Sequence, residues 1–155
     1  MSTIDVSYLY INGKVCVSLL NTWKGEQWTS CQTIRSVLLV LVTLFCKNPL
    51  LNEPGINEFH RDVDNYRHLI QFKNSQVAIC DVLQQYNISQ EFIGFMPIIQ
   101  KYFRDNKTKI LSALEKGSES EENGKIITVD VYSMQSYINY DKLKERFLAE
   151  ISKEN

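Results

Sequence analysis

Residues Asn12 to Trp28 read N-G-K-V-C-V-S-L-L-N-T-W-K-G-E-Q-W, and this stretch places a cysteine close behind a chain reversal. Asn12-Gly13 is a tight-turn dipeptide, and apolar residues follow it at alternate positions, as on one face of a short strand. A cysteine at such a place can reach a surface groove, where its thiolate acts as a nucleophile. Free cysteine is also among the most buried residue types. The pattern alone therefore leaves two interpretations of Cys16, a nucleophile or a packed core residue.

The same stretch resembles the active-site segment of ubiquitin-conjugating enzymes, N-G-x-I/V-C-L-x-I/L-L. The matching residues are Asn12, Gly13, Val15, Cys16, Leu19 and Leu20. It is most similar to the large hybrid conjugating and ligating enzymes of the apollon/BRUCE type, whose motif G-K-V-C-L-S-L-L-x-T-W-x-G precedes a second Trp. A later N-E-P-G of that subgroup is matched by Asn52, Glu53, Pro54 and Gly55. Two motifs at compatible spacing carry the resemblance.

The resemblance implies a ubiquitin transferase in which Cys16 accepts ubiquitin as a thioester and passes it to a substrate lysine. It implies three partners, namely ubiquitin or a ubiquitin-like protein, an activating enzyme and a ligase. No cofactor is expected on this chain, because ATP is used by the activating enzyme. The competing hypothesis is a catalytically inactive variant that serves as a binding or scaffold protein.

Two further site residues follow from comparing this chain with the family pattern. The family has an Asn that donates to the oxyanion eight residues before the cysteine, and Tyr8 stands there instead. Loss of such a donor costs on the order of 100- to 1000-fold in rate, so the Tyr8 hydroxyl is a candidate substitute, with a packing role as the alternative. Glu53 is a candidate for orienting the incoming lysine, and an exposed loop carboxylate is the alternative.

The fold expected from the resemblance is α/β (α+β), a ubiquitin-conjugating-enzyme-like domain that is mostly helical after residue 33. Cys16 stands so early that the chain appears N-terminally shortened, without the N-terminal helix and most of the strand meander of the family. Loss of that sheet would expose the apolar helix that normally crosses it, unless another element or chain covers the helix.

Helical patterns follow the cysteine motif. The apolar run from Val37 to Cys46 is about half the length of a membrane-spanning helix, so we expect a buried helix there. A long helix is predicted from about Asp62 to about Gln85, and Pro97 suits the first turn of another.

The proposed domain division is 1–116 for the conjugating-enzyme-like domain, 117–124 for an acidic linker and 125–155 for a C-terminal extension. The linker reads G-S-E-S-E-E-N-G, a composition typical of a flexible segment. Alternation at Ile127, Val129 and Val131 predicts a strand, and apolar spacing from Leu143 to Ile151 predicts a helix. This extension lies outside the family pattern, and it is our candidate for covering the apolar helix.

Composition narrows the function classes. The chain has 155 residues, 44% of them hydrophobic, and a formal net charge of -1, which favours neither a nucleic-acid partner nor an anionic membrane. The four cysteines form no C-x-x-C pair and no signal peptide precedes them, which predicts an intracellular, cytoplasmic protein. His60 and His68 have no Cys or His at ligand spacing, so no metal site is expected.

Overall fold

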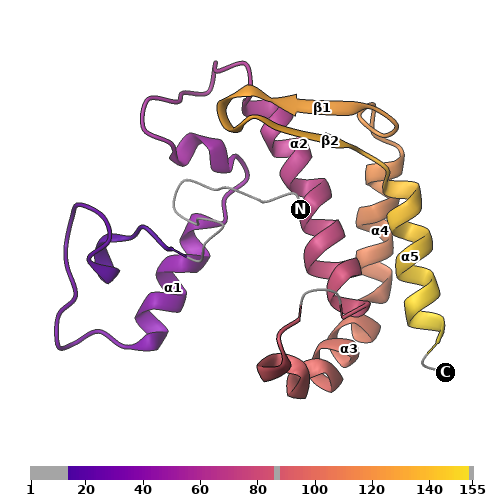
Figure 1. The fold of residues 1–155 in the computed structure, drawn as a ribbon, viewed down its shortest axis with the longest axis horizontal. Coiled ribbons are helices and arrows are strands. Elements are labelled where there is room, and N and C mark those ends of the chain that lie inside the picture. Colours follow the sequence, from indigo (N-terminus) through magenta and orange to yellow (C-terminus); the bar gives the residue numbers. More distant parts are fainter. Residues whose placement is uncertain (1–13, 86–87, 154–155) are drawn as a thin grey trace. The chain divides into compact units, whose positions relative to one another are not determined.

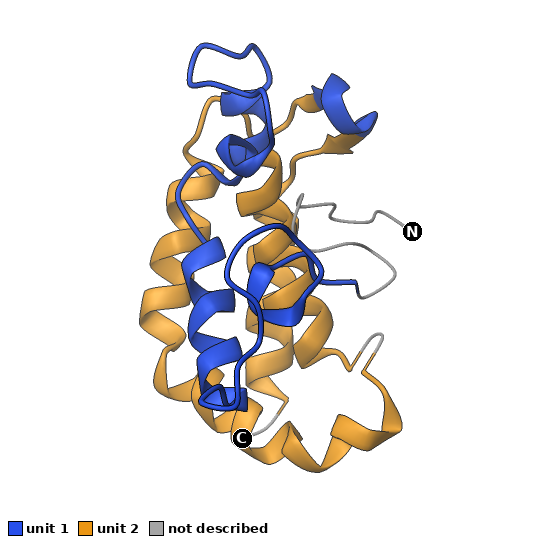
Figure 2. Cartoon of the chain, turned by 90° about the vertical axis from the view of Figure 1, so that its left-hand side faces the viewer, with its two compact units in different colours: residues 1–67, 128–134 blue, residues 68–127, 135–155 orange. Residues whose placement is uncertain are grey.

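The computed structural model describes residues 14–85 and 88–153, which form a mixed α/β fold dominated by helices (Figure 1). Two compact units divide the chain (Figure 2): unit 1 comprises residues 1–67 and 128–134, and unit 2 comprises 68–127 and 135–155. The described part contains one two-stranded antiparallel sheet. The predicted α/β class, mostly helical after residue 33, is confirmed.

The first long helix, α1, spans Ile34–Leu44 and begins where the sequence predicts. Thr33 caps it by accepting a hydrogen bond from the Ser36 backbone, and the Ser36 side chain accepts one from the Thr33 backbone. The expectation that this helix is buried is wrong. None of its residues is buried, and Ile34 is 78% exposed. The sheet among the described residues has only two four-residue strands, too little surface to cover an apolar helix.

Helical structure continues from residue 63 to residue 83, as predicted, but with a change of type inside it. The α-helix α2 spans Val63–Asn74, and the π-helical segment η3 follows at Ser75–Asp81. The next helices are α3, Met96–Asp105, with Pro97 in its first turn as expected, and α4, Lys107–Ser118. The 3-10 turns are η1 (Ser18–Leu20), η2 (Pro49–Asn52), η4 (Gln90–Phe95) and η5 (Asp130–Tyr132).

The last helix, α5 (Tyr140–Ser152), confirms the predicted C-terminal helix and completes the core of unit 2. It lies beside α4 and also packs against η3 (Figure 1). Its buried face includes Phe147, which is fully buried, and Arg146 pairs with Asp81 of η3 at 2.6 Å. The apolar face of α5 is therefore used within unit 2, and our expectation that the extension covers the helix at 34–44 finds no support in these contacts.

The acidic segment 117–124, expected to be a flexible linker, is held by hydrogen bonds. Gly117 lies within the last turn of α4. Asn123 donates to the Asp141 carboxylate at 2.8 Å and accepts from the Tyr140 backbone at 2.9 Å. Because both flanks of the segment belong to unit 2, it joins parts of one unit. Whether residues 1–116 and 125–155 are separate domains stays a prediction.

The predicted strand near Ile127 is confirmed as β1, Ile126–Val129, whereas its partner β2, Met134–Tyr137, was missed. The two strands are joined through η5 and Ser133, which has a left-handed φ of 50°. This connection contains no Gly, Pro or Asn, and its turn-forming residues are Asp130 and Ser133, which are weaker hairpin signals than Asn-Gly or Asp-Gly. The sequence therefore offered only a weak turn signal for the second strand.

Cys80 is fully buried in unit 2, and its Sγ donates to the Leu143 carbonyl oxygen at 3.5 Å. Burial raises the pKa of Cys80 to about 11. A thiol with a raised pKa stabilises the fold while it stays protonated, so this contribution should be lost as the pH rises from about 9 to about 11. We expect the contribution of Cys80 to the free energy of unfolding in urea to fall by about 2–3 kcal/mol over that range.

In a Cys80→Ala variant the free energy of unfolding should fall less between pH 9 and pH 11, because there is no Cys80 thiol to ionise. Cys46→Ala, which removes an exposed thiol, should keep the wild-type dependence on pH. Identical pH profiles for Cys80→Ala and wild type would contradict the prediction.

Candidate functional site

Cys16 lies in a tight loop that ends in η1, not in a strand. Of the two positions left open for Cys16, the conformation described has the packed one, because the Cys16 side chain is only 2% exposed. Val17 and Leu19 are buried with it. In this conformation the thiol is packed away from solvent, so a reaction at Cys16 requires the loop to open.

Thr22 holds this loop closed through its hydroxyl. Its Oγ1 accepts a hydrogen bond from the Val17 backbone N–H at 3.0 Å and lies 2.5 Å from the Val15 carbonyl oxygen, to which it donates. The Thr22 backbone N–H also donates to the Val17 carbonyl at 3.3 Å. These bonds bracket Cys16 on both sides. They give a physical reason for a threonine at this position of the motif.

The second half of the motif contributes a backbone reversal that needs a glycine. Gly25 has a left-handed φ of +136°, and a Cβ placed on it would lie 3.0 Å from the Ser18 Cβ. Asn21 is also left-handed, at φ 57°, and its side-chain oxygen accepts from the Trp28 backbone at 3.1 Å. Residues 21–28 are thereby folded back onto the loop that holds Cys16.

A cavity of about 540 Å³ borders this folded-back segment within unit 1. It is lined by Ser18 and Leu19 of η1, by residues of the 26–32 segment, and by Ser36 and Val40 of α1. Cys16 does not line it. The cavity is thus adjacent to the motif, and the thiol lies outside it.

Glu53, the second candidate, sits in a turn whose form follows from its sequence. The Ile56 N–H donates to the Glu53 carbonyl at 3.2 Å, with Pro54 and Gly55 as the central residues and Gly55 at φ +86°. This is the order that a type II turn requires. The Glu53 carboxylate is half-buried and accepts a hydrogen bond from the Tyr132 hydroxyl.

The structure does not join the candidate residues into one centre. Within the residues it describes, no hydrogen bond or ion pair links Cys16 with Glu53, and the Glu53 carboxylate is already engaged by Tyr132. Tyr8, the proposed oxyanion donor, lies outside the described residues. A role for any of the three in catalysis stays a prediction.

Sequence reasoning missed the contacts that hold the 128–134 segment in unit 1. The buried Asp62 carboxylate accepts from the Val131 N–H at 2.9 Å, and Asn65 donates to the Thr128 carbonyl at 3.1 Å. The two sides of each contact are more than sixty positions apart in the chain. The one signal in the sequence was an aspartate, Asp62, at the predicted start of a helix.

Across 14–85 and 88–153, no group of three or more His, Cys, Asp or Glu side chains is arranged to hold a metal ion. No helix in these same ranges has both the length and the apolar character that crossing a bilayer demands.

Comparison with known proteins supports the ubiquitin-conjugating (E2) family as the class of this chain, at family level. The chain is 43% identical to ubiquitin-conjugating enzyme E2 Z of Danio rerio over 77 residues, which cover 48% of this chain and 24% of that protein. It is 42% identical to E2 Z of Homo sapiens over 77 residues, 48% of this chain and 22% of the relative.

A more distant relative aligns over a longer stretch. The probable ubiquitin-conjugating enzyme E2 23 of Arabidopsis thaliana is 29% identical over 114 residues, 69% of this chain and 10% of that protein. No family model matches the chain. The alignments span about a quarter of the E2 Z proteins or less, so the activity of the whole relatives comes to this chain only as a proposal.

The hydrogen bonds of Thr22 lead to a prediction about Cys16. Thr22→Val removes the hydroxyl but keeps the shape of the side chain, so the loop should open more often. A hydrogen bond to a partly buried group is worth about 1–3 kcal/mol when one partner is lost, and we expect Cys16 alkylation by iodoacetamide to accelerate about tenfold. Peptide mass spectrometry after timed labelling measures the rate.

Thr29→Val is the matched control, because the Thr29 hydroxyl makes no hydrogen bond in the described part of the chain. Thr29→Val should leave the rate of Cys16 alkylation unchanged. The exposed Cys31 should be alkylated at its wild-type rate in both variants. Equal Cys16 rates in Thr22→Val and wild type would refute the role of Thr22.

Proposed function

We propose that Cys16 accepts ubiquitin, or a ubiquitin-like protein, from an activating enzyme and passes it to a substrate lysine. The observation that carries this proposal is the 43% identity to an E2 Z enzyme, supported by the cysteine motif. In the first step the Cys16 thiolate attacks the thioester carbonyl on the activating enzyme, a new S–C bond forms, and the activating enzyme's thiol leaves. In the second step a lysine amine attacks, the C–N bond forms, and Cys16 is released as a thiol.

The same proposal includes a subgroup, roles for two further residues, and partners. The T-W-x-G and N-E-P-G matches support the apollon/BRUCE-type subgroup. Glu53 is proposed to orient the lysine once Tyr132 releases it, and Tyr8 to donate to the oxyanion. The partners would be ubiquitin, an activating enzyme and a ligase, in an intracellular, cytoplasmic setting.

The burial of Cys16 favours a second candidate function, an inactive variant that acts as a binding or scaffold protein. A thiol that is 2% exposed cannot reach a bulky protein thioester without loop opening. The exposed apolar side chains of α1 would suit a binding protein equally well.

One experiment separates the two functions. The full chain is incubated with activating enzyme, ATP and ubiquitin, and the products are resolved with and without reductant. The enzyme proposal expects an ATP-dependent adduct that reductant removes. If activating enzyme that is itself charged with ubiquitin leaves the chain unmodified, the scaffold function is favoured and the transferase is rejected.

A further inference from the structure

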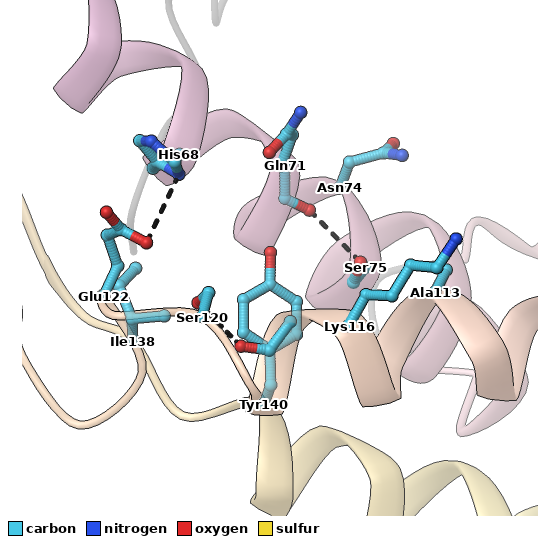
Figure 3. Close-up of a pocket in the computed structure, with 11 residues that line it drawn as sticks. His68, Gln71, Asn74, Ser75, Ala113, Lys116, Ser120, Glu122, Ile138 and Tyr140 are labelled. Atoms are coloured by element: carbon cyan, nitrogen blue, oxygen red, sulfur yellow. Dashed lines mark hydrogen bonds and ion pairs between the residues drawn. The ribbon is translucent and has the colours of Figure 1, made fainter.

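A second cavity, of about 430 Å³, lies wholly within unit 2 and far from Cys16 in the sequence (Figure 3). One wall comes from the long helical stretch, with His68 and Gln71 from α2 and Ser75 from the start of η3. Lys116 of α4 and Glu122 of the turn after it form the facing wall. Its volume is that of a small-molecule site. The helix changes from α to π at its rim, a change found often at functional sites.

Tyr140 forms part of the floor and points its hydroxyl into this cavity (Figure 3). The residue is only 8% exposed, yet its hydroxyl has no hydrogen-bond partner among residues 14–85 and 88–153. Burial, with a smaller effect from Glu122, raises the pKa of Tyr140 to about 12, so the group stays a protonated donor at neutral pH. An unpaired hydroxyl that opens into a cavity is free to donate a hydrogen bond to a bound ligand.

Gly117 gives the Tyr140 ring its position. A Cβ at residue 117 would lie 2.4 Å from the ring Cδ1, so any larger residue would displace the ring. Phe72 holds another side of the ring in an edge contact with centroids 5.3 Å apart. The hydroxyl is therefore presented by a ring that is fixed by packing.

Opposite charges stand on either side of this hydroxyl (Figure 3). Glu122 lies at one side, where its Oε2 is 3.7 Å from His68 Nδ1, an ion pair when the imidazole is protonated. A carboxylate has several lone pairs, so Glu122 can accept a hydrogen bond from a ligand as well. Lys116 lies at the other side, and no acidic side chain of the described residues pairs with it. Ile138, 1% exposed, adds an apolar surface to the lining.

We propose that this cavity binds a small zwitterion of the amino-acid class, with its carboxylate at Lys116, its ammonium group at Glu122, and the Tyr140 hydroxyl donating to the carboxylate. A phosphate would meet repulsion from Glu122, and a simple amine would meet repulsion from Lys116. A ligand that carries both charges can pair with Lys116 and with Glu122, and it can also accept the hydrogen bond of the Tyr140 hydroxyl.

The test titrates the 155-residue chain with glycine, β-alanine and γ-aminobutyrate, which differ in charge separation, and follows binding by isothermal calorimetry and amide chemical shifts. Acetate and ethylamine, each carrying one of the two charges, serve as half-ligands. At least one zwitterion should bind saturably, and about tenfold or more tighter than either half-ligand, because each end adds a charge-assisted hydrogen bond.

The variants Lys116→Met, Glu122→Gln and Tyr140→Phe should each weaken this binding about tenfold. Lys109→Met, on the same helix but outside this cavity, is the matched control and should bind as wild type. Far-UV circular dichroism verifies that each variant is folded. Absence of saturable binding for all three zwitterions, equal binding of a half-ligand, or wild-type affinity in all three cavity variants would overturn the proposal.

Discussion

Replacement of Cys16 by alanine is expected to abolish the ubiquitin adduct completely, while replacement of Cys31 by alanine leaves it intact. The physical reason is that only a thiolate at the motif position can form the thioester, and alanine has no nucleophile. Cys31 is a suitable control because it is exposed and chemically accessible but lies outside the motif. Non-reducing electrophoresis and intact mass spectrometry measure the adduct in each variant.

The Cys16→Ser variant tests whether the bond to ubiquitin forms at this position, because a serine hydroxyl there would form an oxygen ester in place of a thioester. Any adduct on that variant should survive reductant and be cleaved by hydroxylamine. An adduct that persists on Cys16→Ala would show that another residue is modified, and the assignment of Cys16 would then be wrong.

Phe147→Ala should produce the largest loss of stability among single substitutions in α5. Phe147 is fully buried, where α5 packs against α4 and η3. Truncation of a buried phenylalanine costs about 3–5 kcal/mol, because burial is lost and a cavity remains. That is a large fraction of the roughly 5–15 kcal/mol by which a typical domain is stable. Urea unfolding followed by circular dichroism measures the change.

Leu148→Ala is the matched control, because Leu148 is the next residue of α5 and is partly exposed. It should cost about 1 kcal/mol or less, as surface positions generally do. If the free energy of unfolding falls by the same small amount in both variants, α5 is not part of the core of unit 2.

Local signals in the sequence predicted most of the helices well. The apolar run from Val37 to Cys46 predicted the helix that is α1, and Pro97 marks the first turn of α3. Pro54-Gly55 occupies the central positions of a type II turn, the order of residues that this turn requires. Each of these signals acts over a few residues, so no knowledge of the rest of the chain was needed.

Burial was predicted less well than helix position. An apolar pattern shows that α1 needs a partner surface, but only the tertiary structure shows that its side chains are left exposed. Conversely, the turn before Cys16 suggested an accessible thiol, whereas the Thr22 hydroxyl closes the loop and buries it. The hydroxyl bonds of Thr22 depend on three-dimensional distances that the motif does not state.

By itself the sequence indicated a resemblance to ubiquitin-conjugating enzymes, because the cysteine motif and its turn residues are contiguous and can be recognised without coordinates. Only the tertiary structure decided that Cys16 is held closed, that Glu53 is engaged by Tyr132, and that the 140–152 helix belongs to the core of unit 2. It also brought His68, Lys116 and Tyr140 together around one cavity. Those residues are distant in the chain, and packing between helices, which no local pattern records, places them side by side.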